Sequence, residues 1–533
     1  MDPLTTVSTR ATPQWLRAED RQIPNAAGGF GFALGDDARV LRFLTLGVDG
    51  GTYYASDREL TAQNAGVVLR TAQARASWLV EQAVAISTAG RAPRQNPAVF
   101  ALAAAAALGD EAGRRAALDA LPAVCRTGTH LFLFARYAEQ FRGWGRGLRR
   151  AVARWYTAPA VDDVAFQAVK YRQREGWSHR DLLRLAHPAT TEPDRRALFR
   201  WIVTGEVGDD APELVRGLVG ARAATTPAEW IRLVIDHRLG WEMLPDAALV
   251  EPDVWRALLA VGLPPTALMR QLPRLTRLGV LTGDRLRRVA AQLADPERLR
   301  RGRIHPISVL VALRTYAAGR GRGASWTPKR EIVDALDAAF STAFGTIEPA
   351  GKRTLLALDV SGSMNYGTVS GLPISPREAS AALALVTMAT EPDTTCVGFT
   401  STGGWATRGS FTALTELAIS PRQRLDDAVR AVRDLPWGGT DCSLPMRWAQ
   451  ETGREVDTFV VLTDNETWAG PTHPHQALRR YRERTGIDAK LVVVGMTAND
   501  VSIADPSDPG MLDVAGFDAA APGLVAAFSR GDF

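Results

Sequence analysis

The sequence predicts a multidomain protein in which an all-α, HEAT-like solenoid is followed by an α/β domain. Up to about residue 345, apolar residues recur at three- and four-residue spacing, which is typical of amphipathic helices. After Gly351, short apolar runs alternate with amphipathic segments, the order expected of a mostly parallel sheet covered by helices. We therefore expect a helical domain over residues 1–350 and an α/β domain over residues 351–533.

The helical segments of the first domain are short and are separated by Gly/Pro/Thr breaks such as AGRAPRQNP and VGLPPT. Helices that cannot each bury a face alone are expected to stack in pairs, as in α-solenoids. Because no crisp repeat period is present, the pattern predicts HEAT-like stacking without a repeat motif. The clearest segments are ELTAQNAGVVLRTA, ASWLVEQAVAIS, PAVFALAAAAALG, TPAEWIRLVIDHRL, DVWRALLAVG, ISVLVALRTYAAG and REIVDALDAAFSTAF.

The composition is that of a soluble globular protein. The chain has 533 residues, of which 46% are apolar and 23% charged. The N-terminal residues lack a basic stretch followed by an apolar one, and the longest apolar block, AVFALAAAAAL, is too short to cross a bilayer. The three cysteines, Cys125, Cys396 and Cys442, have no disulfide or zinc spacing. These features favour a cytoplasmic protein without a membrane partner.

Charge is distributed unevenly between the two regions. Residues 351–533 carry 16 Lys and Arg against 22 Asp and Glu, whereas the first 350 residues carry 47 basic against 36 acidic residues. A basic helical region therefore precedes a mildly acidic α/β region. Only four basic residues are Lys, and an Arg bias of this kind suits phosphate contacts but also follows from codon composition alone.

The α/β domain places oxygen-bearing side chains where ligands usually bind. The apolar runs TLLALDV, TCVGFT, TFVVLTD and AKLVVVGM read as strands, and Asp359 and Asp464 each end one of them. The loop DVSGSM adds Ser361 and Ser363, and the loop WGGTDCSLP adds Thr440 after two glycines. Hydroxyl and carboxylate oxygens are hard ligands, so these five residues predict a site for Mg²⁺ or Mn²⁺.

Two other interpretations of the DVSGSM loop remain. A serine nucleophile needs a general base, and the only nearby histidines are His473 and His475. A polar turn after a strand needs no chemistry, but it does not account for Thr440 and Asp464 in the two later loops.

The pattern Asp-x-Ser-x-Ser followed by Thr and Asp resembles the metal-ion-dependent adhesion site of von Willebrand factor A domains. That resemblance implies direct metal contacts from the hydroxyls, carboxylates acting largely through waters, and an acidic group of a partner completing the shell. Together with the glycine-rich segment of residues 22–56, the motifs DVSGSMN, GGTDCSLPM and LTDNETWAG resemble the Ro autoantigen family and its TROVE domain, over nearly the whole chain.

The family resemblance implies a monomeric ring of HEAT-like helices closed by the A domain. It further implies that the ring binds small noncoding Y RNA on its outer surface and takes single-stranded ends of misfolded RNA into a central hole. Bacterial members imply a 3′-exoribonuclease partner, polynucleotide phosphorylase, and roles in RNA quality control, rRNA maturation and stress survival.

One segment, Lys170 to Pro188, predicts an RNA contact. Ser178 and Asp181 are spaced as a helix N-cap pair. At 100° per residue, Leu182, Leu185 and Ala186 share one face of the helix, and the opposite face is basic. The residues expected on that face and just before it are Arg180, Arg184 and His187, extended by Lys170, Arg172 and Arg174. Charge alone favours a solvated face of a basic protein over an RNA contact. The family resemblance reverses that preference, because it implies Y RNA contacts at Lys170 and His187.

Other basic residues are also candidates for RNA contacts, with a purely structural role as the alternative. Arg136 and Arg142 lie among aromatic residues in HLFLFARYAEQFRGWGRGLRR, a composition suited to single-stranded RNA, although several rings must be core. The segment RTYAAGRGRGAS predicts a basic loop containing Arg314, Arg320 and Arg322. By contrast, His130 and His179 are expected to cap or pack helices.

Three functions are consistent with these motifs. The first is a noncatalytic RNA-binding ring, which the basic region and the resemblance favour. The second is a metal-dependent adhesion or assembly module supported by helices. The third is an Mg²⁺-dependent hydrolase or nuclease, which usually needs several carboxylates, whereas three of the five candidate ligands here are hydroxyls.

Overall fold

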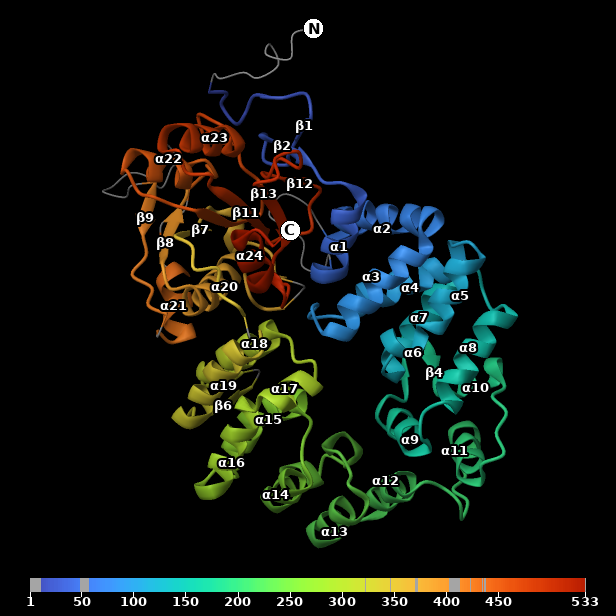
Figure 1. The fold of residues 1–533 in the computed structure, drawn as a ribbon. Helices are drawn as coiled ribbons and strands as arrows, with labels where there is room; N and C mark the ends of the chain where they lie inside the picture. Colours follow the sequence, from blue (N-terminus) through green and yellow to red (C-terminus); the bar gives the residue numbers. More distant parts are fainter. Residues whose placement is uncertain are drawn as a thin grey trace.

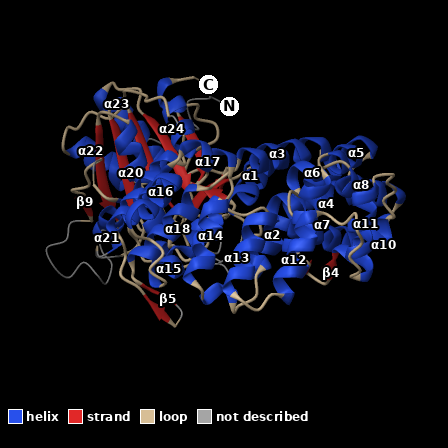
Figure 2. Ribbon diagram, turned by 90° about the horizontal axis from the view of Figure 1, so that it is seen from below, coloured by secondary structure: helices blue, strands red, loops and turns tan. Residues whose placement is uncertain are grey.

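The helices of the first domain follow one another around a ring, and the α/β domain sits against its two ends (Figure 1). This computed structural model describes residues 11–47, 57–321, 323–345, 347–369, 372–401, 413–421, 423–433, 435 and 438–532. Viewed at 90° to Figure 1, the longer strands gather at one end of the molecule and helices make up the rest (Figure 2). The predicted combination of a helical solenoid and an α/β domain is thus confirmed.

The ring begins with α1 (Asp36–Leu46), α2 (Asp57–Ala74), α3 (Ala76–Ala89), α4 (Asn96–Leu108), α5 (Glu111–Asp119), α6 (Leu121–Val124), α7 (Gly128–Phe141), α8 (Arg146–Thr157), α9 (Val161–Lys170) and α10 (His179–Ala186). It continues with α11 (Pro193–Thr204), α12 (Glu213–Ala223), α13 (Pro227–His237), η2 (Trp241–Met243), η3 (Ala248–Val250), α14 (Pro252–Val261), α15 (Pro265–Arg277), α16 (Gly283–Ala294), α17 (Pro296–Arg301), α18 (Pro306–Ala317) and α19 (Arg330–Thr342).

The alanine-rich helix α4 lies inside the first half of the ring. It packs against α2, α3, α5 and α7, and nearly all of its side chains are buried, which explains why it lacks a polar face. Small side chains let these neighbouring helices approach closely, so the apolar block serves helix packing. No helix within the described ranges is long and apolar enough to cross a membrane.

Residues far apart in the sequence close the ring. The Arg303 side chain donates from Nε to the backbone oxygen of Thr88 at 2.8 Å, across 215 residues. His305 Nε2 lies 2.9 Å from the backbone oxygen of Arg91. Arg91 in turn pairs with Asp518 of the α/β domain. The two ends of the solenoid and the second domain therefore meet at one junction.

Two short strand pairs interrupt the helices, where the sequence pattern indicated none. β3 (Gln173–Arg174) pairs with β4 (Trp177–Ser178), and β5 (Arg320–Gly321) pairs with β6 (Ala324–Ser325). Each strand has two residues, so neither is long enough to show an alternating pattern.

The α/β domain contains a six-stranded sheet in the order β13-β11-β10-β7-β8-β9. All neighbours pair in parallel except β9, which runs antiparallel to β8. Strand β7 is buried along its whole length, in keeping with its continuous apolar sequence. The strands are β7 (Thr354–Asp359), β8 (Thr394–Phe399), β9 (Leu414–Glu416), β10 (Thr458–Thr463), β11 (Lys490–Gly495) and β13 (Met511–Ala515).

Helices cover both faces of this sheet. One face packs on α20 (Pro376–Thr390) and α24 (Ala521–Arg530), and its core is continuous with that of the ring. The other packs on α22 (Leu444–Glu451) and α23 (Pro474–Thr485) over a separate core. The 3₁₀ turn η4 (Ser363–Asn365) follows β7, and α21 (Leu425–Arg433) packs on α20.

The glycine-rich N-terminal segment belongs structurally to the α/β domain. β1 (Gln22–Pro24) and β2 (Phe30–Ala33) form a hairpin whose second strand pairs with β12 (Val501–Ser502). Residues 48–56, the end of that segment, lie outside the described residues. The first described residues therefore reach the sheet domain before the chain enters the ring.

Candidate metal centre and nucleic-acid interface

The candidate metal centre lies at the carboxyl ends of neighbouring strands. Asp359 is the last residue of β7, and its Oδ1 accepts the Ser361 backbone N–H at 2.8 Å. The hydroxyl oxygens of Ser361 and Ser363 lie 3.1 Å apart, with Ser363 beginning η4. A tight turn after the strand thus gathers these three side chains, all buried, at the sheet edge.

Two further loops bring Thr440 and Asp464 to the same place. The Gly362 N–H donates to the backbone oxygen of Gly438 at 3.2 Å, which joins the first loop to the second. The Trp468 N–H donates to the Thr440 oxygen at 3.1 Å, which joins the second to the third. Asp464 follows β10, and Ser363 hydrogen-bonds to its carboxyl. The structure therefore brings all five predicted residues together.

The charges of the carboxyl groups in this centre are only partly compensated. Burial, together with the neighbouring Asp359 and Glu466 carboxyls, raises the pKa of Asp464 to about 8. Burial likewise raises the pKa of Asp359, opposed by hydrogen bonds from Ser361 and Thr463 and by the charge of Arg377. Two buried acids side by side cannot both ionise without a nearby cation, so the centre favours positive charge.

The side chain of Thr440 is a further indication that this centre could hold a ligand. Its hydroxyl oxygen is buried and has no hydrogen-bond partner among the described residues, a state that costs about 1–3 kcal/mol. Its loop is joined by backbone hydrogen bonds to the loops that carry the serines and Asp464, and the hydroxyl and carboxylate oxygens of these loops are a donor set that fits a hard divalent cation. The residues that could hold such an ion are Asp359, Ser361, Ser363, Thr440 and Asp464.

Glu466 was missed by the sequence interpretation. It is buried two residues after Asp464 and accepts the Ala27 N–H at 3.1 Å and an Asn499 amide proton at 3.2 Å. Its position in the LTDNET loop, next to Asp464, could have indicated it. Its hydrogen-bond partners could not be predicted, because Ala27 lies hundreds of residues away and Asn499 lies in another loop. Glu466 links the N-terminal hairpin to the candidate metal centre.

The histidines considered as general bases are engaged elsewhere. His473 lies 2.8 Å from the backbone oxygen of Leu16 and 3.1 Å from the side chain of Gln22. His475 lies 3.3 Å from Glu19. Both therefore anchor the N-terminal segment. Within the described ranges, no group of three or more His, Cys, Asp and Glu side chains is arranged to hold a metal ion.

The segment predicted to contact RNA forms a hairpin followed by a capped helix. Ser178 accepts the Asp181 N–H at 3.3 Å, and Asp181 accepts the Ser178 N–H at 2.9 Å, which confirms the capping pair. Arg180, Arg184 and His187 are exposed, as expected for the polar face of α10. The buried face differs in part: Leu182 and Leu183 are buried, whereas Leu185 and Ala186 are only half-buried.

The flanking cations are less free than the sequence suggested. Lys170 is half-buried, with its Nζ 3.2 Å from Glu242 and over the rings of Phe166 and Tyr171. Arg136 pairs with Glu175 in the turn of the hairpin. Only Arg172 and Arg174 remain exposed without a carboxylate partner within the described ranges. Acidic residues distant in sequence therefore neutralise part of the predicted basic stripe.

The remaining candidates have separate environments. Arg142 is exposed and lines a pocket between helices. The sequence predicted that Arg314 would lie in a loop, and this prediction is wrong. Arg314 lies in α18, where it pairs with Glu378 of the α/β domain at 2.5 Å. Arg320 is exposed in β5, and Arg322 lies outside the described residues.

Of the two histidines expected to cap or pack helices, His179 is buried in the helical domain and His130 is half-buried. The Tyr156 hydroxyl lies 2.6 Å from Nδ1 of His179, whose ring contacts Phe132 edge-on. This cluster confirms the packing role of His179. Burial, with a smaller contribution from Arg126, lowers the pKa of His130 to about 4.

The fold defines a ring of helices joined to a von Willebrand factor A domain, with the five candidate metal-site residues at the edge of its sheet. The sequence matches the TROVE domain over residues 23–206 and 230–320, and the Ro60 vWA domain over residues 353–529. The chain belongs to the Ro60 family.

Its relatives include proteins from bacteria and animals. The chain is 43% identical to the RNA-binding protein RO60 of Deinococcus radiodurans, over 98% of this chain and 97% of the relative. It is 36% identical to the RNA-binding protein RO60 of Caenorhabditis elegans, over 98% and 92%. The crystal structure of the Deinococcus radiodurans Ro (RSR) protein superposes with a TM-score of 0.71 at 43% identity, covering 94% of this chain and all of that one.

Proposed function

We propose that this protein is a noncatalytic RNA-binding ring whose outer surface at α10 contacts RNA phosphates. The observation that carries the proposal is the exposed face of Arg180, Arg184 and His187 on a helix fixed by its capping box. Neither arginine has a carboxylate partner within the described residues. Exposed cations held in a fixed geometry neutralise phosphates and release their counterions.

The finer part of the proposal follows the family. The bound RNA is a small noncoding Y RNA, and single-stranded ends of misfolded RNA also bind. The monomeric ring then presents RNA in the cytoplasm to a 3′-exoribonuclease, polynucleotide phosphorylase, in RNA quality control, rRNA maturation and stress survival. The protein itself contributes binding, and its partner contributes cleavage.

The RNA contact is tested by replacing Arg180, Arg184 and His187 together with alanine. We expect affinity for a structured small RNA to fall about tenfold or more near 0.1 M salt, because two phosphate contacts are lost. The slope of log affinity against log salt should shrink by about 2. Fluorescence anisotropy over a salt series measures both quantities.

A matched control replaces Arg287 and Arg300 with alanine, since both are exposed but already paired with Asp284 and Glu297. This variant should bind RNA with nearly unchanged affinity. If the folded α10 variant kept the affinity and salt slope of the original protein, α10 would be removed from the interface.

We further propose that the adhesion-site residues hold Mg²⁺ or Mn²⁺. The hydroxyls of Ser361, Ser363 and Thr440 and the carboxyls of Asp359 and Asp464 supply the oxygen ligands, directly or through waters. An acidic group from a protein partner would complete the shell, because two carboxylates leave a six-coordinate cation short of ligands. The bound cation neutralises the buried acids and gives the Thr440 hydroxyl a partner.

Replacing Asp359 with alanine should abolish metal binding while leaving RNA affinity nearly intact. Isothermal titration with Mn²⁺ measures the first effect and the anisotropy assay the second. The control is Asp488→Ala, which removes a fully exposed acid of the same domain. Undiminished Mn²⁺ binding in Asp359→Ala would contradict the site. A loss of RNA affinity equal to that of the α10 variant would contradict the separation of the two functions.

A further inference from the structure

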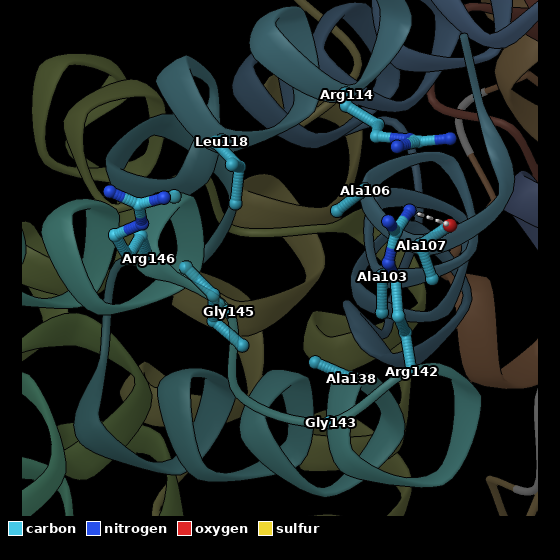
Figure 3. A pocket seen from close by; sticks show the side chains of 12 residues that line it. Ala103, Ala106, Ala107, Arg114, Leu118, Ala138, Arg142, Gly143, Gly145 and Arg146 are labelled. Carbon is cyan, nitrogen blue, oxygen red and sulfur yellow. Dashed lines mark hydrogen bonds between the residues drawn. The ribbon is translucent and has the colours of Figure 1, made fainter. Parts of the chain in front are cut away.

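A basic pocket opens between α4, α5, α7 and α8, on the part of the ring next to α10. Its volume is about 260 Å³, far more than a single water needs. Figure 3 shows Arg146 on one side and Arg114 and Arg142 on the other, with the Gly143–Gly145 turn between them. Ala103, Ala106 and Leu118 supply the apolar part of its wall.

The three arginines of this pocket carry uncompensated charge. Arg114 donates to the backbone oxygen of Gly109 at 2.6 Å, and Arg142 donates to that of Ala107 at 3.3 Å. No described carboxylate pairs with Arg114, Arg142 or Arg146. Three guanidinium groups line one hollow from two sides, and each keeps unused N–H donors, so an anion is the ligand that they fit.

Two other arginines near the pocket do form ion pairs with carboxylates. Arg115 pairs with Glu111 and Arg154 with Asp119, each at 2.8 Å. The pocket arginines thus differ from these two in having no ion pair with a carboxylate of the described residues. The α8 N-terminus adds backbone N–H groups, since Gly145 provides no side-chain cap.

The pocket continues into a groove along α8. A second hollow of about 530 Å³ shares Leu118 and Gly147 with the first and also includes Arg150 and Ala189. The helix from its start to Thr157 is about 18 Å long at 1.5 Å per residue, so more than one nucleotide can lie along it. Ala189 is two residues beyond His187, so the groove leads from the proposed RNA-binding face of α10 to the pocket.

We propose that this pocket binds a phosphate of single-stranded RNA, whose strand runs along α8 from the RNA held at α10. Arg114, Arg142 and Arg146 contact the phosphate, and the adjoining sugar or base lies against Ala106 and Leu118. This proposal rests on the proposed RNA binding, and it specifies the path of the unpaired strand on the protein surface. A strand fits better than a small phosphorylated molecule because the groove extends past the pocket, where it is lined by Arg150 and by Arg154 paired with Asp119.

The test compares Arg142→Gln/Arg146→Gln with Arg149→Gln in the full-length protein. Arg149 is exposed on the same helix but lines neither hollow, so it is a matched control. For a ten-nucleotide oligouridylate, we expect the double variant to lose about tenfold or more in affinity and about 2 in salt slope. The control should stay within about twofold of the original protein.

Three other outcomes are decisive. Equal oligouridylate binding by the double variant and the control would overturn the pocket, while α10-dependent binding of structured RNA would leave the proposed function standing. If uridine monophosphate competes as well as the oligonucleotide, the pocket binds a small phosphorylated molecule and the proposed RNA strand is ruled out. Failure of the original protein to bind either RNA would overturn the proposed function itself, and the strand path with it.

Discussion

Replacing Arg42 with alanine is expected to destabilise the native protein by about 3–5 kcal/mol, because the change removes one partner of a buried ion pair. The side chain of Arg42 is 2% exposed and reaches from α1 into the α/β domain. Its guanidinium lies 2.6 Å from Asp513 and 2.7 Å from the side-chain oxygen of Asn499, and also donates to the Val501 backbone oxygen. Alanine would remove this donor from the Asn499 and Val501 oxygens and leave Asp513 with the Ser502 hydroxyl but without its cation.

Denaturant unfolding followed by circular dichroism measures this effect, with Arg70→Ala as the control. Arg70 pairs with Asp36 at the surface, where both side chains are about half-exposed, so its loss should cost less than about 1 kcal/mol. Because the chain has two domains, we expect a separate early transition in Arg42→Ala as they undock. Matching unfolding curves for the two variants would show that Arg42 does not hold the domains together.

The ion pairs between domains give the uneven charge of the sequence a structural role. Basic residues of the first region meet acidic residues of the second at several points, and these pairs include Arg21–Asp505, Arg42–Asp513, Arg91–Asp518 and Arg314–Glu378. The opposite net charges of the two regions are visible in the sequence, and the basic charge of the first region was interpreted there as favouring RNA binding. Part of that charge instead docks the domains on each other.

The parts of the candidate site that sequence could predict are those encoded locally. Asp359, Ser361 and Ser363 lie within five residues, and Thr440 and Asp464 each belong to a loop next to a recognisable strand or glycine pair, so their order alone indicated one sheet edge. The capping pair of α10 was equally local.

The missed features depend on contacts between distant residues. β2 pairs with β12, which lies more than 450 residues later, so no local pattern indicates that partnership. The neutralisation of Arg136 by Glu175 and of Lys170 by Glu242 depends on how the ring folds. Apolar periodicity fixes which face of a helix is buried, but it does not say which charged residue of another helix will lie opposite.

Acidification from pH 6.5 toward pH 5 is expected to destabilise the helical ring steeply, because burial keeps three histidines in their neutral form. Burial lowers the pKa of His130, His179 and His305 to about 4, against an ordinary value of 6.5. Between those values the unfolded chain binds protons that the folded chain does not. The contribution of each histidine to stability is therefore complete above pH 6.5 and falls by about 1.4 kcal/mol per pH unit below it.

His305 ties this acid sensitivity to the closure of the ring. Its Nδ1 accepts the Ile307 N–H at 3.1 Å, so the neutral ring carries its proton on Nε2, which lies 2.9 Å from the Arg91 oxygen. Protonation of Nδ1 removes that acceptor at the junction of the solenoid ends and the α/β domain. His305→Gln should therefore reduce the slope of unfolding free energy against pH by about one proton between pH 5 and 6.5. The carboxyls of Glu19 and Asp505, with pKa values of about 2, contribute only at lower pH. Asp464, with its pKa raised to about 8, adds a slope of opposite sign in this window, which is common to both proteins and cancels from their comparison. An unchanged slope in His305→Gln would mean that the junction is not an acid-sensitive contact.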